Sequence, residues 1–144
     1  MKTTTILDTL ADTTWDSVAG YRKAAEEAKS PALTQLLTER AAKREATLDA
    51  LNDELARFGE DRVTSGSASG WLHRKFTEVS AMFDGSDEAA MERIEEGEDY
   101  LKGKFAEAAK SDDLDAQSRR VVEQGYAEIS QGERLSDLLE AAYD

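Results

Sequence analysis

Cysteine is absent from this chain of 144 residues, which also has only one proline and one histidine. Without cysteine the chain can form no disulfide, no zinc–thiolate cluster and no thiol nucleophile, and several classes of enzyme are therefore excluded. A chain of this length can bury a sufficient core as one unit without such cross-links. We expect a single domain over residues 1–144.

Long apolar runs are missing as well. In the N-terminal stretch MKTTTILDTLADTTWD no more than two apolar residues follow one another, which fits neither a signal peptide nor a membrane span. The default localisation is the cytoplasm. The 31 acidic and 18 basic side chains give a net charge of −13. A negative surface repels phosphate backbones and anionic lipids, so we expect no nucleic-acid or membrane partner.

Helical periodicity is present almost everywhere. Apolar residues recur at three-to-four spacing over about residues 4–28, 31–58, 87–110 and 113–142, which predicts four long helices. The sequence Ser30-Pro31 favours a tight turn followed by a capped second helix. Gly59 is expected to end that helix, and Ser111 to cap the fourth.

The connection between the second and third helices spans about 28 residues and contains a shorter amphipathic segment at residues 70–83. Such a connection is long enough to run along the bundle. It predicts two antiparallel hairpins joined by one long crossover that contains a short helix. The predicted fold is therefore all-α, a four-helix bundle with ferritin-like connectivity.

Three segments carry a resemblance to a known family. They are LLTERAAKRE at 36–45, TSGSASGWLHRKF at 64–76 and ERIEEGEDYLKGKF at 92–105. With these segments the whole chain resembles a bacterial family of ferritin-like four-helix-bundle proteins of unassigned function. The resemblance implies the fold and a bacterial origin, and it implies no reaction.

The sequence lacks the histidines that a di-iron centre in this fold requires. Such a centre takes a Glu-x-x-His motif from each of two helices, because this spacing places both ligands on one inner face. Here no glutamate on the second or fourth helix is followed by histidine at that spacing. The single histidine, His73, lies on the crossover segment and is interpreted as a surface or packing residue. Asp16 falls off the apolar stripe of the first helix.

Charged residues nevertheless interrupt the apolar stripes near mid-bundle. Arg44, Glu98 and Glu128 each occupy an inward position, and Ser17 and Tyr21 bring hydroxyl groups to the same level. Because buried charges must be paired, we predict that Arg44 bridges the two glutamates where related bundles hold metal. The alternative is that small helix rotations carry these side chains to a solvated edge.

The glycines in the last two predicted helices support a crowded centre. Gly97, Gly103, Gly125 and Gly132 each lower helix stability by about 1 kcal/mol relative to alanine. Two explanations for this loss of helix stability stay open. Either two helix backbones approach each other closely at the glycines, or the glycines leave room around the side chain of Glu128.

The aromatic residues beside the stripes have two interpretations. Trp15, Trp71 and Tyr143 either seal the rim of the core or contribute to a homodimer contact. Neither interpretation needs a cofactor, and the expected cofactor set is empty.

Three classes of function stay open. The preferred one is a non-enzymatic bundle, a structural or interaction protein that is linked to stress only by analogy with the fold. The second is a metal binder or weak oxidase that uses carboxylates alone, from Glu39, Glu45, Glu98 and Glu128. The third binds an apolar ligand or a partner helix through the crossover segment, with Trp71, Phe76, Met82 and Phe83.

Overall fold

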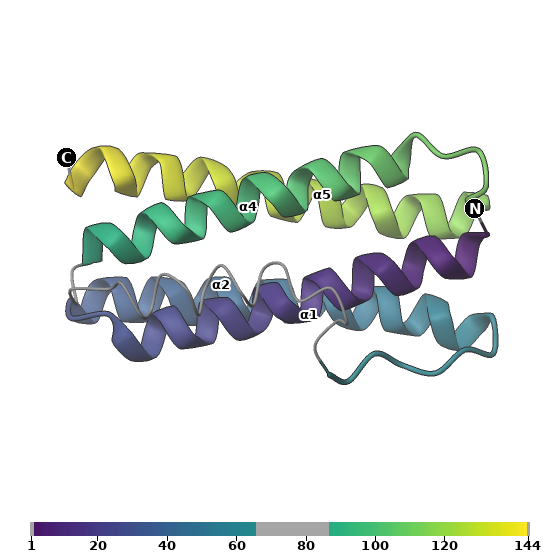
Figure 1. Ribbon diagram of the computed structural model, residues 1–144, viewed down its shortest axis with the longest axis horizontal. Coiled ribbons are helices and arrows are strands. Elements are labelled where there is room, and N and C mark those ends of the chain that lie inside the picture. Colours follow the sequence, from purple (N-terminus) through teal and green to yellow (C-terminus); the bar gives the residue numbers. More distant parts are fainter. Residues whose placement is uncertain (1, 66–86, 144) are drawn as a thin grey trace.

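The computed structural model describes residues 2–65 and 87–143, which form four α-helices along one long axis (Figure 1). Helix α1 spans Thr3–Glu27, α2 Pro31–Arg57, α4 Asp87–Ala109 and α5 Ala116–Tyr143. No strand occurs within these two ranges. The expected all-α four-helix architecture is confirmed.

The helices pair as two hairpins. α1 packs chiefly on α2, and α4 chiefly on α5, while contacts of α2 with α5 and of α1 with α4 close the bundle. The turn between α1 and α2 is short, and so is the turn between α4 and α5, so each pair is antiparallel (Figure 1). The inner faces of all four helices therefore meet along a common core.

The predicted start and end of α2 agree with the structure. The Ser30 hydroxyl accepts a hydrogen bond from the backbone N–H of Leu33, and Pro31 occupies the first turn. Gly59 follows the helix with a φ of 80°, a left-handed conformation that glycine adopts without steric strain. Phe58 is the C-cap residue of α2 and is 38% exposed.

The predicted start of the last helix is wrong. α5 begins at Ala116 and not near residue 113, because Asp115 and not Ser111 caps it. The Asp115 carboxylate accepts a hydrogen bond from the backbone N–H of Ser118 at 2.8 Å, the usual contact of an N-cap. On α5, Val122 and Ile129 are fully buried, whereas Val121 is partly exposed.

The end of α2 and the start of α4 lie at opposite ends of the bundle (Figure 1). The Asp87 carboxylate accepts hydrogen bonds from the backbone N–H groups of Lys29 and Ser30, at the turn between α1 and α2. At the other end, Arg57 is ion-paired with Asp115 beside the start of α5. The short helix expected at residues 70–83 lies outside the described residues, as do His73 and Trp71.

The apolar core is divided into two clusters. One joins the first half of α1, the second half of α2, the second half of α4 and the first half of α5, and the other joins the opposite halves of α1, α2 and α4. Arg44, Glu98 and Ser17 are buried at the level between the two clusters. The bundle therefore has a polar middle between two apolar layers.

Hydropathy gives no sign of a membrane segment in the described helices. Over residues 2–65 and 87–143, none is both long and apolar enough to cross a bilayer.

Candidate functional site

Arg44 on α2 lies at the centre of the polar middle, with a side chain that is 0% exposed. Its Nη1 donates to Glu98 Oε1 at 2.6 Å and to Ser17 Oγ at 2.5 Å. Its Nη2 donates to Glu98 Oε2 at 2.7 Å and to Glu128 Oε2 at 3.1 Å, and its Nε donates to Glu128 Oε1 at 2.8 Å. A guanidinium carries five N–H donors, so each of them has an acceptor.

Two further residues hold Glu128 in place. Arg40 Nη2 donates to Glu128 Oε2 at 2.5 Å and to the backbone carbonyl of Glu128 at 2.9 Å. The Thr47 hydroxyl donates to Glu128 Oε1 at 2.8 Å. Arg40 and Thr47 were not among the predicted site residues. Their signal was spacing, because residues four before and three after Arg44 lie on the same face of α2.

The centre is balanced in charge. Arg40 and Arg44 contribute two positive charges, and Glu98 and Glu128 contribute two negative ones, all within direct ion-pair distance of a partner. Glu98 is as deeply buried as Arg44, whereas 15% of the Glu128 side chain is exposed at the edge of the bundle. A neutral, mutually hydrogen-bonded group can stay in the core without an external counter-ion.

The surroundings keep Arg44 charged. Burial lowers the pKa of its guanidinium, but the adjacent Glu98 carboxylate outweighs this effect and raises the pKa above its ordinary value. Since arginine is already protonated at every physiological pH, the Arg44 guanidinium keeps its positive charge in the core.

Tyr21 on α1 covers the guanidinium. Its ring centroid lies 5.4 Å from Arg44 Cζ, within the range of a cation–π contact. Burial, followed by the negative charge of Glu98, raises the pKa of the Tyr21 hydroxyl above its usual range. The phenol therefore stays neutral. All five residues assigned to the predicted cluster, Ser17, Tyr21, Arg44, Glu98 and Glu128, lie together in the structure.

Glycines on α5 make room for this centre. A Cβ added at Gly132 would lie 2.5 Å from Glu98 Oε2 and 2.8 Å from Arg40 Nη2. A Cβ added at Gly125 would lie 2.5 Å from the Phe105 ring. The space at these two glycines is thus occupied by neighbours that include Glu98, Arg40 and Phe105, and Glu128, for which room was expected, is not among the nearest ones. Nothing lies within 4 Å of a Cβ at Gly103.

The carboxylates proposed as alternative metal ligands are not brought together. Glu39 is exposed and accepts a hydrogen bond from Gln35, while Glu45 pairs with Arg22 at 2.5 Å. Neither of these two interactions involves Glu98 or Glu128. Among the described residues, no three His, Asp or Glu side chains are grouped closely enough to hold a metal ion.

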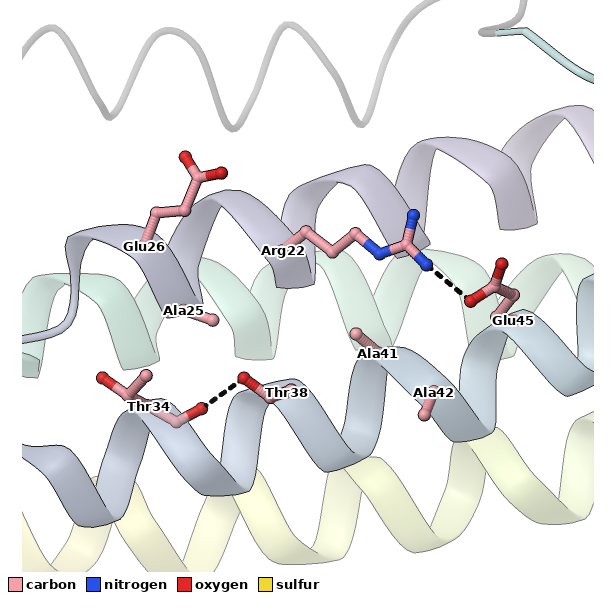
Figure 2. Close-up of a pocket in the computed structure, with 8 residues that line it drawn as sticks. All are labelled: Arg22, Ala25, Glu26, Thr34, Thr38, Ala41, Ala42 and Glu45. Carbon is pink, nitrogen blue, oxygen red and sulfur yellow. Dashed lines mark hydrogen bonds and ion pairs between the residues drawn. The ribbon is translucent and has the colours of Figure 1, made fainter.

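Glu45 instead lines a groove of about 460 Å³ between α1 and α2. Figure 2 shows the Arg22–Glu45 pair at one end of the groove and Glu26 at the other. The wall between them is made of small residues, Ala25, Ala41 and Ala42 with two threonines. The groove presents only one ion-paired cation and two carboxylates, so its chemistry selects no particular ligand. Residues Trp71, Phe76, Met82 and Phe83, assigned to an apolar-ligand site, lie outside the described residues.

One expectation about the first helix is wrong. Asp16 was placed off the apolar stripe, but it is 2% exposed. Asp12, one turn earlier, is half-buried near Asp8 and Asp16. Burial and these two neighbouring charges raise the pKa of Asp12 above its ordinary value. The buried face of α1 is thus wider than its apolar stripe.

A second polar cluster joins α2 to α5 near their ends. The buried Glu54 carboxylate accepts hydrogen bonds from Arg57, Ser118 and Gln117 at 2.8–2.9 Å. Arg57 also pairs with Asp115 at 2.7 Å. Burial alone would raise the pKa of Glu54, but the hydrogen bonds outweigh it and lower that pKa. The hydrogen bond from Arg57, with the backbone N–H of Ser118, lowers the pKa of Asp115 to about 2.

The fold and the centre define a class of protein, a four-helix bundle with a buried, charge-balanced arginine–glutamate group. The chain belongs to the family described as "Domain of unknown function (DUF2383)", whose model matches residues 2–111. The match includes α1, α2 and α4 and therefore Arg44 and Glu98, and it ends before α5 and Glu128. Among curated proteins, no relative matches this sequence.

Proposed function

We propose that this chain is a non-enzymatic, ferritin-like bundle, a structural or interaction protein in which an arginine replaces the metal centre. The observation that carries the proposal is the position of the Arg44 guanidinium, which uses all five N–H donors on Glu98, Glu128 and Ser17. The end of α2 and the start of α4 lie at opposite ends of the bundle, and this arrangement supports ferritin-like connectivity.

The residues present do not fit a di-iron or similar metal centre. In ferritin-like bundles the carboxylates at this level point at metal ions. Here both carboxylates point at arginine N–H groups, and a cation placed between them would meet a positive guanidinium. Catalysis also needs a group that can accept a proton or bind a substrate, and each of these side chains already has a partner inside the cluster.

Replacement of Arg44 by leucine tests the structural role. The variant leaves Glu98 and Glu128 with only Arg40 as counter-charge, so we expect the free energy of unfolding to fall by about 3–5 kcal/mol. Urea unfolding followed by circular dichroism measures this change. Arg22→Leu is the matched control, since the Arg22–Glu45 pair is about half-exposed on both sides and contributes little. A leucine variant as stable as the parent would contradict the proposal.

Metal analysis of the freshly purified protein separates this proposal from the carboxylate-only metal binder. We expect iron and manganese far below one ion per chain after dialysis. Stoichiometric metal that survives dialysis would overturn the proposal in favour of a metal-dependent function.

The remaining parts of the proposal concern cellular context. We propose a bacterial, cytoplasmic protein that avoids nucleic acid because of its net charge of −13. Trp15 is partly buried against the apolar core, which favours rim sealing over a dimer contact for this residue. Homodimer formation stays a prediction, and light scattering at several protein concentrations tests it.

A further inference from the structure

The group around Arg44 has the features of a ligand site that the chain fills by itself. Five acceptor contacts at 2.5–3.1 Å surround one planar cation, and they come from α1, α4 and α5, while the cation belongs to α2. The Tyr21 ring covers the guanidinium. Ser17, Glu98 and Glu128 lie on α1, α4 and α5, so a substitution of Arg44 on α2 leaves all three acceptor residues in the chain.

We propose that Ser17, Glu98, Glu128 and Tyr21 form a binding site for a guanidinium cation, which accepts a free alkylguanidinium when the Arg44 side chain is shortened. This inference rests on the structural role proposed above for Arg44. It goes further because it assigns a ligand class to these four residues, which we call the cage. The assignment is independent of the Arg44 side chain that now occupies the cage.

Charge determines that the guest must be a cation. With Arg44 shortened, Arg40 provides one positive charge against the two carboxylates, so the cage carries a net charge of −1. A monovalent guest restores neutrality. A divalent metal ion would leave a net charge of +1 in a buried site.

Geometry determines that the guest should be planar. Glu98 receives two parallel N–H bonds from Nη1 and Nη2, and Glu128 receives bonds from Nε and Nη2. This fork matches a guanidinium and not a spherical ion or an ammonium group. Thr47 and Arg40 hold Glu128 from outside the cage, so its carboxylate keeps a partner when Arg44 is shortened.

The experiment uses the full-length Arg44→Ala variant and methylguanidinium as the probe. We expect the variant to lose thermal stability relative to the parent and to regain about 3–6 °C in Tm at 20 mM methylguanidinium. Urea, which has the same shape without charge, and sodium chloride should give no such gain. The parent protein in the same solutions corrects for general solvent effects. Calorimetric titration should show one guest per chain.

The double variant Arg44→Ala, Glu98→Gln is the matched control. It keeps the Arg40–Glu128 pair, which is neutral and directly bonded, so this protein should fold. It removes the charge that the guest needs, and the gain in Tm with methylguanidinium should be lost. An equal gain in both variants would overturn the assignment of the site.

Each other outcome has a distinct meaning. If Arg44→Ala is as stable as the parent, the proposed structural role fails. If the variant is destabilised but methylguanidinium gives no gain, the guanidinium site is refuted and the structural role stands. A larger gain with magnesium or manganese than with methylguanidinium also refutes it. If the variant is unfolded alone, the same titration is read as recovered helical signal, and no recovery refutes the site.

Discussion

At Gly132 the backbone of α5 lies against the buried charges, so this residue links local sequence to the geometry of the centre. Alanine there would place a methyl carbon 2.5 Å from Glu98 Oε2. The Glu98 carboxylate cannot swing away at low cost, because it is held by two bonds from Arg44. Overpacking of this kind outweighs the gain in helix propensity, and we expect Gly132→Ala to lower the unfolding free energy by about 1–2 kcal/mol.

Gly103→Ala is the control for this prediction. Gly103 is exposed inside α4, and an added Cβ meets nothing within 4 Å. The substitution should therefore stabilise the protein by about 0.5–1 kcal/mol through helix propensity alone. Urea unfolding of both variants measures the contrast. Equal stabilisation by both substitutions would show that α5 does not crowd the charged centre.

At the same scale, single residues explain why only part of the centre was predicted from sequence. Arg44, Glu98 and Glu128 were visible because each interrupts an apolar stripe at helical spacing. Asp16 was missed because it lies beside the stripe of α1, where a side chain is either solvated or buried depending on a small rotation of the helix. The partner helices decide that rotation, and the periodicity of one helix does not record it.

Among the helices, α5 differs most from its expected start, and its cap accounts for the difference. The sequence Ser-Asp-Asp-Leu-Asp offers several cap residues in succession, from Ser111 to Asp115. Local sequence does not choose among them. Asp115 is selected because its carboxylate can accept from the Ser118 N–H and pair with Arg57 on α2 at the same time.

Substitutions at the cap test this choice. We expect Asp115→Ala to lower Tm by about 3–5 °C, because an unsatisfied N–H group and the contact to Arg57 are both affected. Asp115→Asn keeps the cap oxygen and should lose less. Ser111→Ala should change Tm by less than about 1 °C, since the Ser111 hydroxyl only accepts a bond from Asp113 within an exposed turn. A larger loss for Ser111→Ala than for Asp115→Ala would reassign the cap.

Over the whole molecule, the sequence predicted the four helices well because each has a long apolar stripe and clear breaks. The order of packing was also accessible, since short turns after α1 and α4 permit only antiparallel neighbours. The polar middle depends on contacts between residues far apart in the chain, such as Arg44 with Glu128. In the sequence, only the predicted inward positions of these residues and their complementary charges indicated such contacts.

Two regions of the molecule respond to acid in opposite directions. The folded-state pKa of Asp12 is raised by burial and by neighbouring aspartates, so its ionised form destabilises the folded state. Protonation relieves this destabilisation as pH falls through the raised pKa. The net charge of −13 acts in the same direction, because acidification reduces repulsion between surface carboxylates. This contribution to stability should therefore rise as the pH falls through the raised pKa of Asp12 toward the unfolded-state value near 4.

The cluster joining α2 to α5 has the opposite sign. The pKa of Asp115 is lowered to about 2, and that of Glu54 is lowered as well, so their stabilisation is complete above the unfolded-state values near 4. It is lost as pH falls from about 4 through the folded-state values. Urea unfolding at closely spaced pH values between 7 and 2, on the parent and on two variants, separates the two contributions. Asp12→Asn should flatten the rise and Asp115→Asn the fall, because each removes one titrating carboxylate. A monotonic decline from pH 7, identical in both variants, would contradict this assignment of the two regions.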